Sequence, residues 1–204
     1  MTPTQTATRL LEAGKPVEGL TFPQGFEFGG VAKATFRGCY FTGGKTNLRL
    51  LDIPEVFITD STFGGMSGPP DPDGQAIQLI RCGGVITGIE CFATTRTEDL
   101  VSIYGDKAST RSLRLTIQDF KLHGRGDSPS STSICIDGPH PPQTTIGPGT
   151  IQGARVGIQL AGGSNHTLKE GITFEKCQND VAVHPYYKGA FGPFTIWKGY
   201  RVLK

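Results

Sequence analysis

Two aspartates, Asp60 and Asp119, occupy the same place in a recurring sequence pattern, and Glu90 falls in the repeat between them. If the repeats stack as coils about 4.8 Å apart, the two aspartates lie about 10 Å apart. Inverting glycosidases divide general acid and base catalysis between two carboxyl groups about 6.5–9.5 Å apart. Asp60, Glu90 and Asp119 are therefore candidate catalytic residues. The alternative, which we favour, is that they are corner carboxylates that accept hydrogen bonds from loop N–H groups.

A second group of polar residues falls in three segments, which follow Phe63, Phe92 and Leu122. In stacked repeats these segments leave the scaffold at one corner, and loops on a rigid scaffold commonly carry function. This corner is our first choice for a recognition site. Its candidate ligand-binding residues are Asp71, Asp73, Arg96, Glu98, Asp99, His123, Arg125 and Asp127.

Neither a metal ion nor a cofactor is predicted. The four histidines do not recur at a shared repeat position, and the five cysteines form no short metal-ligand spacing. We interpret the cysteines as small apolar residues of the core. Residues 125–127 form an Arg-Gly-Asp tripeptide that resembles an integrin-binding loop, but these residue types are also ordinary turn formers.

Composition and charge exclude several classes of protein. The 204 residues include 29 glycines and 14 prolines, which argues against a helical bundle. A formal net charge of +2 without a cluster of basic residues gives no indication of a nucleic-acid partner. No apolar run is long enough for a membrane span, and the first residues do not form a secretion signal. We expect neither nucleic acid nor membrane as a partner.

Two apolar patterns alternate along the chain and define an internal repeat. The first is a short alternating strand, spaced 23 to 24 residues where no Gly/Pro/Ser-rich insertion intervenes, as it does at 64–75 and 123–132. Its apolar pairs are Leu48/Leu50, Ile77/Leu79, Val101/Ile103, Ile134/Ile136, Ile158/Leu160 and Val181/Val183. Equivalent pairs are predicted to stack in ladders, because a unit of this size cannot bury its apolar face alone.

The second pattern is a strand that closes on a large apolar residue, clearest at 36–41, 58–63 and 117–122. It predicts another ladder, formed by Phe41, Phe63, Phe92, Leu122, Ile151 and Phe174. Each repeat thus has at least two short strands joined by polar corners. Six to seven coils of this kind form a rod about 30 Å long.

This arrangement resembles the right-handed parallel β-helix of the pectate-lyase-like superfamily, over roughly residues 17–203. Pectate lyases of this fold use a calcium-binding carboxylate cluster and a basic residue, which Asp71, Asp73 and Arg96 would imitate. The related polygalacturonase-like hydrolases carry an Asp-Asp pair and a Gly-His-Gly segment, and this sequence contains neither. A β-sandwich is the alternative fold. A doubly wound α/β fold is excluded, since no helical segment separates the strands after residue 14.

The predicted fold class is all-β, a single parallel β-helix with a short N-terminal capping helix. The helix is expected from Thr6 to Ala13, with Gly14 as its stop signal. Residues 1–29 form the N-terminal cap and lead-in coil, and residues 30–204 form the β-helix. Covering the first coil is the expected role of the helix.

Six residues occupy the outward positions of the first ladder: Arg49, Gln78, Ser102, Cys135, Gln159 and Ala182. One charge among six predicts a flat neutral sheet suited to packing against another subunit or, alternatively, to binding a glycan. The last half coil, Phe194 to Leu203, would leave core side chains uncovered. The candidate oligomer-interface residues are Gln78, Ser102, Cys135, Gln159, Trp197 and Tyr200. We expect a homo-oligomer, with a trimer favoured, and another virion protein at the C-terminal end.

The favoured function is a non-enzymatic structural or recognition protein of a virion, similar in character to phage tail-spike or head-decoration β-helices. Such a protein is made in the host cytoplasm, where free cysteines persist, and it contacts host-surface glycans. The alternative is a polysaccharide lyase or glycoside hydrolase that acts on an acidic polysaccharide. A third hypothesis is a secreted or cell-surface carbohydrate-binding or adhesive module.

Overall fold

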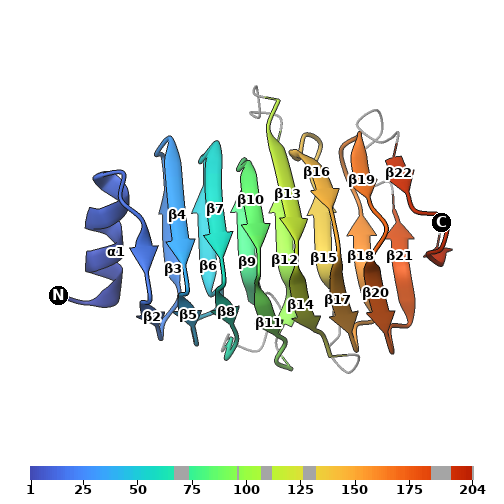
Figure 1. Ribbon diagram of the computed structural model, residues 1–204, viewed down its shortest axis with the longest axis horizontal. Coiled ribbons are helices and arrows are strands. Elements are labelled where there is room, and N and C mark those ends of the chain that lie inside the picture. Colours follow the sequence, from blue (N-terminus) through green and yellow to red (C-terminus); the bar gives the residue numbers. More distant parts are fainter. Residues whose placement is uncertain (67–73, 96, 107–111, 126–131, 185–193, 204) are drawn as a thin grey trace.

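The protein is a parallel β-helix with one short N-terminal helix (Figure 1). The computed structural model describes residues 1–66, 74–95, 97–106, 112–125, 132–184 and 194–203. Three sheets run along the rod, and every strand pair in them is parallel. The predicted fold class is confirmed.

Each sheet takes every third strand of the chain, except that β23 directly follows β22 and joins sheet C. Sheet A consists of β1 (Val17–Glu18), β4 (Lys33–Arg37), β7 (Glu55–Thr59), β10 (Gly84–Thr87), β13 (Arg114–Gln118), β16 (Gln143–Ile146), β19 (His166–Leu168) and β22 (Phe194–Ile196). Sheet B consists of β2 (Thr21–Phe22), β5 (Tyr40–Phe41), β8 (Thr62–Phe63), β11 (Glu90–Phe92), β14 (Phe120–His123), β17 (Gly149–Gln152) and β20 (Ile172–Glu175). Sheet C consists of β3 (Phe26–Gly29), β6 (Leu48–Leu51), β9 (Gly74–Ile80), β12 (Thr97–Tyr104), β15 (Thr132–Asp137), β18 (Val156–Leu160), β21 (Asn179–Val183) and β23 (Val202–Leu203). The described residues thus form seven complete three-strand coils and part of an eighth.

The inward row of sheet C is the ladder that the first sequence pattern predicts. Leu48 pairs with Ile77, and Ile77 pairs with Val101. The row continues in register through Ile134, Ile158 and Val181. These side chains are fully buried, as expected where alternate residues of a strand face the core.

The second sequence pattern is two strands rather than one, joined by a corner between sheets A and B. At the corner a single residue takes positive φ: Gly38 (57°), Asp60 (50°), Gly88 (65°) and Asp119 (52°). This left-handed conformation turns the chain, and glycine and aspartate tolerate it better than most residues. The sequence pattern merged the two strands into one because each of them is short and only one or two residues separate them at these corners.

The position of Phe92 corrects the second predicted ladder. Phe63 pairs with Cys91, and Cys91 pairs with Leu122, so the fully buried Cys91 occupies the inward position. Phe92 pairs with His123 and is 41% exposed. Ile58 pairs with Ile86, so the residue equivalent to Phe63 is Cys91, one residue before Phe92. A shift of one residue moves a side chain to the opposite face.

Aromatic rings stack along the axis in the N-terminal half of the core. The ring centroids of Phe22 and Phe41 are 4.6 Å apart, and those of Phe41 and Phe63 are 4.7 Å apart. The ring planes of both pairs are nearly parallel, with angles of 8° and 4° between them. Each stacked pair adds about 0.5–1.5 kcal/mol to the burial of its rings. The coil spacing itself therefore sets a favourable stacking distance.

The helix α1 (Pro3–Glu12) begins and ends earlier than the sequence predicts. Thr2 is the N-cap, and with Gln5 it forms a capping box that satisfies free N–H groups of the first turn. Pro3 follows directly, where the lack of an N–H costs nothing. Ala7 and Leu11 are buried against the first coils, near β1, β2 and β4. The predicted covering role is thus confirmed.

Replacing Phe63 with alanine should lower the free energy of unfolding by about 3–5 kcal/mol, because the ring is fully buried. The matched control is Phe92→Ala, which removes the same side chain from the outer face and should cost less than about 1 kcal/mol. Urea unfolding followed by circular dichroism measures both. Equal losses would contradict the assignment of Phe92 to the outer face.

His166 makes the stability of the fold dependent on pH. It is fully buried, its Nδ1 accepts a hydrogen bond from the Thr144 N–H (3.1 Å), and its Nε2 donates to the Gly162 carbonyl (3.0 Å). Burial lowers the pKa of His166, and the bond to Gly162 offsets this only in part. The unfolded chain, where the pKa is about 6.5, therefore takes up the proton more readily than the folded chain.

Stability should consequently fall as the pH drops below about 6.5, because protonation favours the unfolded chain. Urea midpoints measured between pH 5 and pH 8 test this expectation. In a His166→Gln variant this component of the pH dependence should disappear. An unchanged pH profile in that variant would show that other groups are responsible.

Candidate functional site

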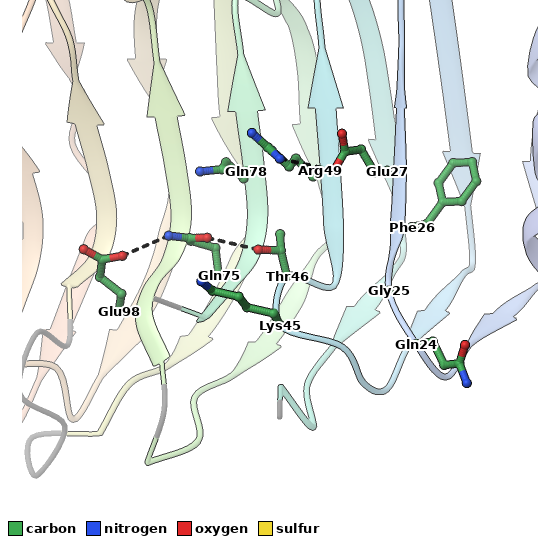
Figure 2. A pocket seen from close by; sticks show the side chains of 10 residues that line it. All are labelled: Gln24, Gly25, Phe26, Glu27, Lys45, Thr46, Arg49, Gln75, Gln78 and Glu98. Carbon is green, nitrogen blue, oxygen red and sulfur yellow. Dashed lines mark hydrogen bonds and ion pairs between the residues drawn. The ribbon is translucent and has the colours of Figure 1, made fainter. Parts of the chain in front are cut away.

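A hollow runs along the outer face of sheet C. Its first part has a volume of about 600 Å³ and lies over β3, β6 and β9 (Figure 2). Its second part, of about 720 Å³, continues over β9, β12, β15 and β18. Gln75, Gln78 and Glu98 line both parts, so the two form one groove, which we call the sheet C groove.

The outward row of sheet C forms the floor of the groove. Arg49 pairs with Gln78, Gln78 with Ser102, Ser102 with Cys135, and Cys135 with Gln159. This row is the one that the sequence predicts. The expectation that the face is flat is wrong, because residues beside the row and in the turns before its strands raise walls around it.

Charged groups lie in and around the floor row, which changes the predicted neutral character of the face. The lining residues with acidic or basic side chains are Glu27 and Arg49 in the row itself, and Lys45, Glu98, Asp99, Asp137, Arg155 and His184 beside it. Two of these opposite charges are paired with each other, since Arg49 Nη1 lies 3.2 Å from Glu27 Oε2. The groove thus presents charges of both signs along with amides and hydroxyls.

A chain of hydrogen bonds fixes the amide of Gln75 at the centre of the groove (Figure 2). Thr46 Oγ1 donates to Gln75 Oε1 (3.1 Å), and Gln75 Nε2 donates to Glu98 Oε2 (3.0 Å). Gln78 lies further along the same strand, and within the described residues its amide makes no hydrogen bond. A fixed amide beside an uncommitted one offers oriented donors and acceptors to a polar ligand.

Asp99 is the most deeply buried acid of the groove, with 8% of its surface exposed. The pairing of β12 with β9 shifts between Thr97 and Asp99, which is the irregularity that brings Glu98 and Asp99 together at this edge. Burial raises the pKa of Asp99, and the nearby charges of Glu98 and Asp137 raise it further. A carboxyl group of this kind holds its proton longer than usual and donates a hydrogen bond.

Of the predicted ligand-binding residues, the structure brings Glu98 and Asp99 into the groove. His123 lies elsewhere, on the outer face of sheet B, where its Nε2 is 3.0 Å from Glu90 Oε1. Arg125 is exposed just beyond β14. The remaining predicted residues, Asp71, Asp73, Arg96 and Asp127, lie outside the described part of the chain.

Asp60 and Asp119 lie at corners between sheets A and B, away from the groove lining. Asp119 Oδ2 accepts a hydrogen bond from Thr87 Oγ1 (3.1 Å). The equivalent corner between them is Gly88, whereas Glu90 lies inside β11. Asp60 and Asp119 recur in the sequence because both occupy the positive-φ position of an equivalent corner. A catalytic role for Asp60, Glu90 and Asp119 stays a prediction.

The last described coil carries the two other predicted interface residues. Trp197 is 46% exposed and lines an apolar hollow of about 480 Å³ with Phe194, Ile196 and Val202. The Tyr200 hydroxyl donates to the Lys169 carbonyl (2.7 Å) and accepts from the Ile172 N–H (2.9 Å). Tyr200 therefore ties this coil to the preceding one, and its part in an interface stays a prediction.

Several groove residues escaped the sequence analysis. They are Gln24, Glu27, Lys45, Thr46, Gln75, Tyr104, Asp137, Arg155 and His184. A usable signal existed for two of them, since Tyr104 and Asp137 follow Ser102 and Cys135 by two residues and pair with each other. Most of the others lie in turns or at strand ends, where the repeat no longer predicts which way a side chain points.

The chain was compared with protein-family models, with curated proteins and with solved structures, and none of the three comparisons gave a match. No group of metal-ligating side chains is found among the described residues. No helix in the described part of the chain is long and apolar enough to cross a membrane.

Proposed function

We propose that this protein recognises a glycan and binds an extended polysaccharide along the sheet C groove. The observation that carries the proposal is the groove itself, a long polar hollow on a rigid sheet. From β3 to β18 it crosses five strand spacings, which is about 24 Å. That length accommodates several linked sugar units rather than a single small molecule.

The lining favours a carbohydrate over other ligands. Sugar hydroxyls need donors and acceptors, and amide side chains supply them at two places in the groove: Gln75 and Gln78 on β9, and Gln159 on β18, three strands further along the sheet. Apolar groups are few, which disfavours a lipid. The carboxylates of Glu27, Glu98 and Asp137 would repel the phosphates of a nucleic acid.

The setting that we propose is a virion, with the chain acting as a tail-spike-like or head-decoration β-helix of the pectate-lyase-like type. All five cysteines are buried and unpaired, which suits a protein that folds in the reducing cytoplasm of a host cell. The apolar hollow beside Trp197 supports the part of the proposal that concerns assembly, as a homo-oligomer or with another virion protein.

Gln78→Ala should weaken polysaccharide binding about tenfold, because it removes the uncommitted amide at the centre of the groove. Isothermal titration with soluble neutral and acidic polysaccharides measures the effect. Thr116→Ala is the matched control, since Thr116 faces outward on sheet A and should leave binding unchanged. Binding that is equally strong in Gln78→Ala, or absent in the wild type, would refute groove recognition.

Hydrolysis in the same groove is a second candidate function, and Asp99 is the observation that favours it. Its raised pKa suits a general acid that protonates the glycosidic oxygen, with Glu98 or Asp137 as the carboxylate partner. The wild type should then release reducing ends from a bound polysaccharide. Asp99→Asn should lower the rate of this release at least a hundredfold, while polysaccharide binding remains. If the wild type binds a polysaccharide without cleaving it, this second function fails and recognition alone stands.

A further inference from the structure

The outer face of sheet B carries an exposed aromatic ring, and beside it is a position that no side chain of the described residues fills, which we call the open position. The outward row there, read from the N-terminal side, consists of Thr42, Gly64, Phe92, His123, Gln152 and Glu175. Thr42 and Gly64 belong to it because each directly follows an inward phenylalanine, Phe41 or Phe63. This row is on a different sheet from the groove and shares no residue with its lining.

One face of the Phe92 ring is held firmly. The ring stacks on the imidazole of His123, with centroids 4.6 Å apart and planes 3° apart. His123 is held in turn from both edges, by Glu90 Oε1 at 3.0 Å and by Gln152 Oε1 at 3.4 Å. These contacts support one face of a phenylalanine that is 41% exposed on the surface.

Beside the other face of the ring, Gly64 contributes no side chain. A Cβ built at Gly64 would meet only Phe92 atoms within 4 Å, the nearest being Phe92 Cβ at 3.6 Å. The backbone of Gly64 is not in the left-handed region, so its conformation does not demand glycine. Phe92 and Thr42 are two coils apart, about 9–10 Å, which leaves space for one ring in van der Waals contact on each side.

Polar groups border this position along the strands. Thr62 and Glu90 pair with each other on the same outward face, two residues before Gly64 and Phe92. Glu90 uses Oε1 for His123, and its side chain is 40% exposed. An apolar ring face with a hydroxyl and a carboxylate at its edge is the arrangement that suits a ligand with one apolar face and a hydroxylated rim.

We propose that the open position at Gly64 binds one hexopyranose unit, which stacks on the free face of Phe92 and donates hydroxyl hydrogen bonds to Glu90. An all-equatorial pyranose has the required shape, because its axial C–H bonds form an apolar face and its hydroxyls lie at the rim. The site is separate from the sheet C groove and does not depend on the function proposed for it.

Two substitutions test the site from opposite directions. Phe92→Ala removes the stacking ring, whereas Gly64→Phe fills the open position with a side chain that would itself stack on Phe92. Methyl β-D-glucopyranoside and methyl β-D-galactopyranoside are the probes, titrated into the labelled full-length chain by NMR. In the wild type, at least one probe should shift the Phe92 and His123 ring signals. Both variants should weaken this binding at least tenfold, and Gln78→Ala should leave it unchanged.

The outcome is decided even if Phe92→Ala is poorly folded, because Gly64→Phe adds a contact and removes none. The proposal is overturned if neither probe shifts the two rings in the wild type, or if Gly64→Phe binds as tightly as the wild type. If Gln78→Ala does not weaken polysaccharide binding, only the proposed function of the sheet C groove is refuted. The results that overturn the two proposals are therefore different.

Discussion

The hydrogen-bonding register between successive coils is the constraint on which the rest of this structure depends. Every strand pairs in parallel with strands one coil before and one coil after, so each side chain meets its equivalents at a fixed spacing. Inward rows must then be apolar along their length, as the row through Ile77 and Val101 is. The same spacing brings Phe22, Phe41 and Phe63 into a favourable stack. Register, more than any single contact, holds this core together.

The same constraint also shapes the outer faces, where equivalent side chains of successive coils form rows. On sheet C the row through Gln78 and Ser102 lies between charged walls and becomes the floor of a groove. On sheet B the row through Phe92 and His123 is interrupted by Gly64 and becomes a platform beside an open position. A rigid rod therefore presents two unlike surfaces, one long and polar and the other short and aromatic.

Polar side chains supply hydrogen bonds where the pairing between strands stops. Asn47 is fully buried, and its Nδ2 donates to the carbonyls of Gly43 and Gly64 at the corner beside sheet C. Asp180 lies in β21; burial alone would raise the pKa of its carboxyl, but hydrogen bonds from the guanidinium and the backbone N–H of Arg201, together with the Arg201 charge, lower that pKa. Corners and ends, where ladder hydrogen bonds stop, are thus completed by side chains.

The sequence by itself determined the fold class and the rows, since a period of 23 to 24 residues with paired apolar positions admits few other solutions. It correctly predicted the row from Arg49 to Gln159, because alternation along a strand fixes which side chains face outward. Tertiary structure alone decided that Cys91 rather than Phe92 faces the core, because a shift of one residue reverses both faces. It also decided that Glu98 and Asp99 face the groove, because an irregular pairing directs them there and the repeat does not encode it.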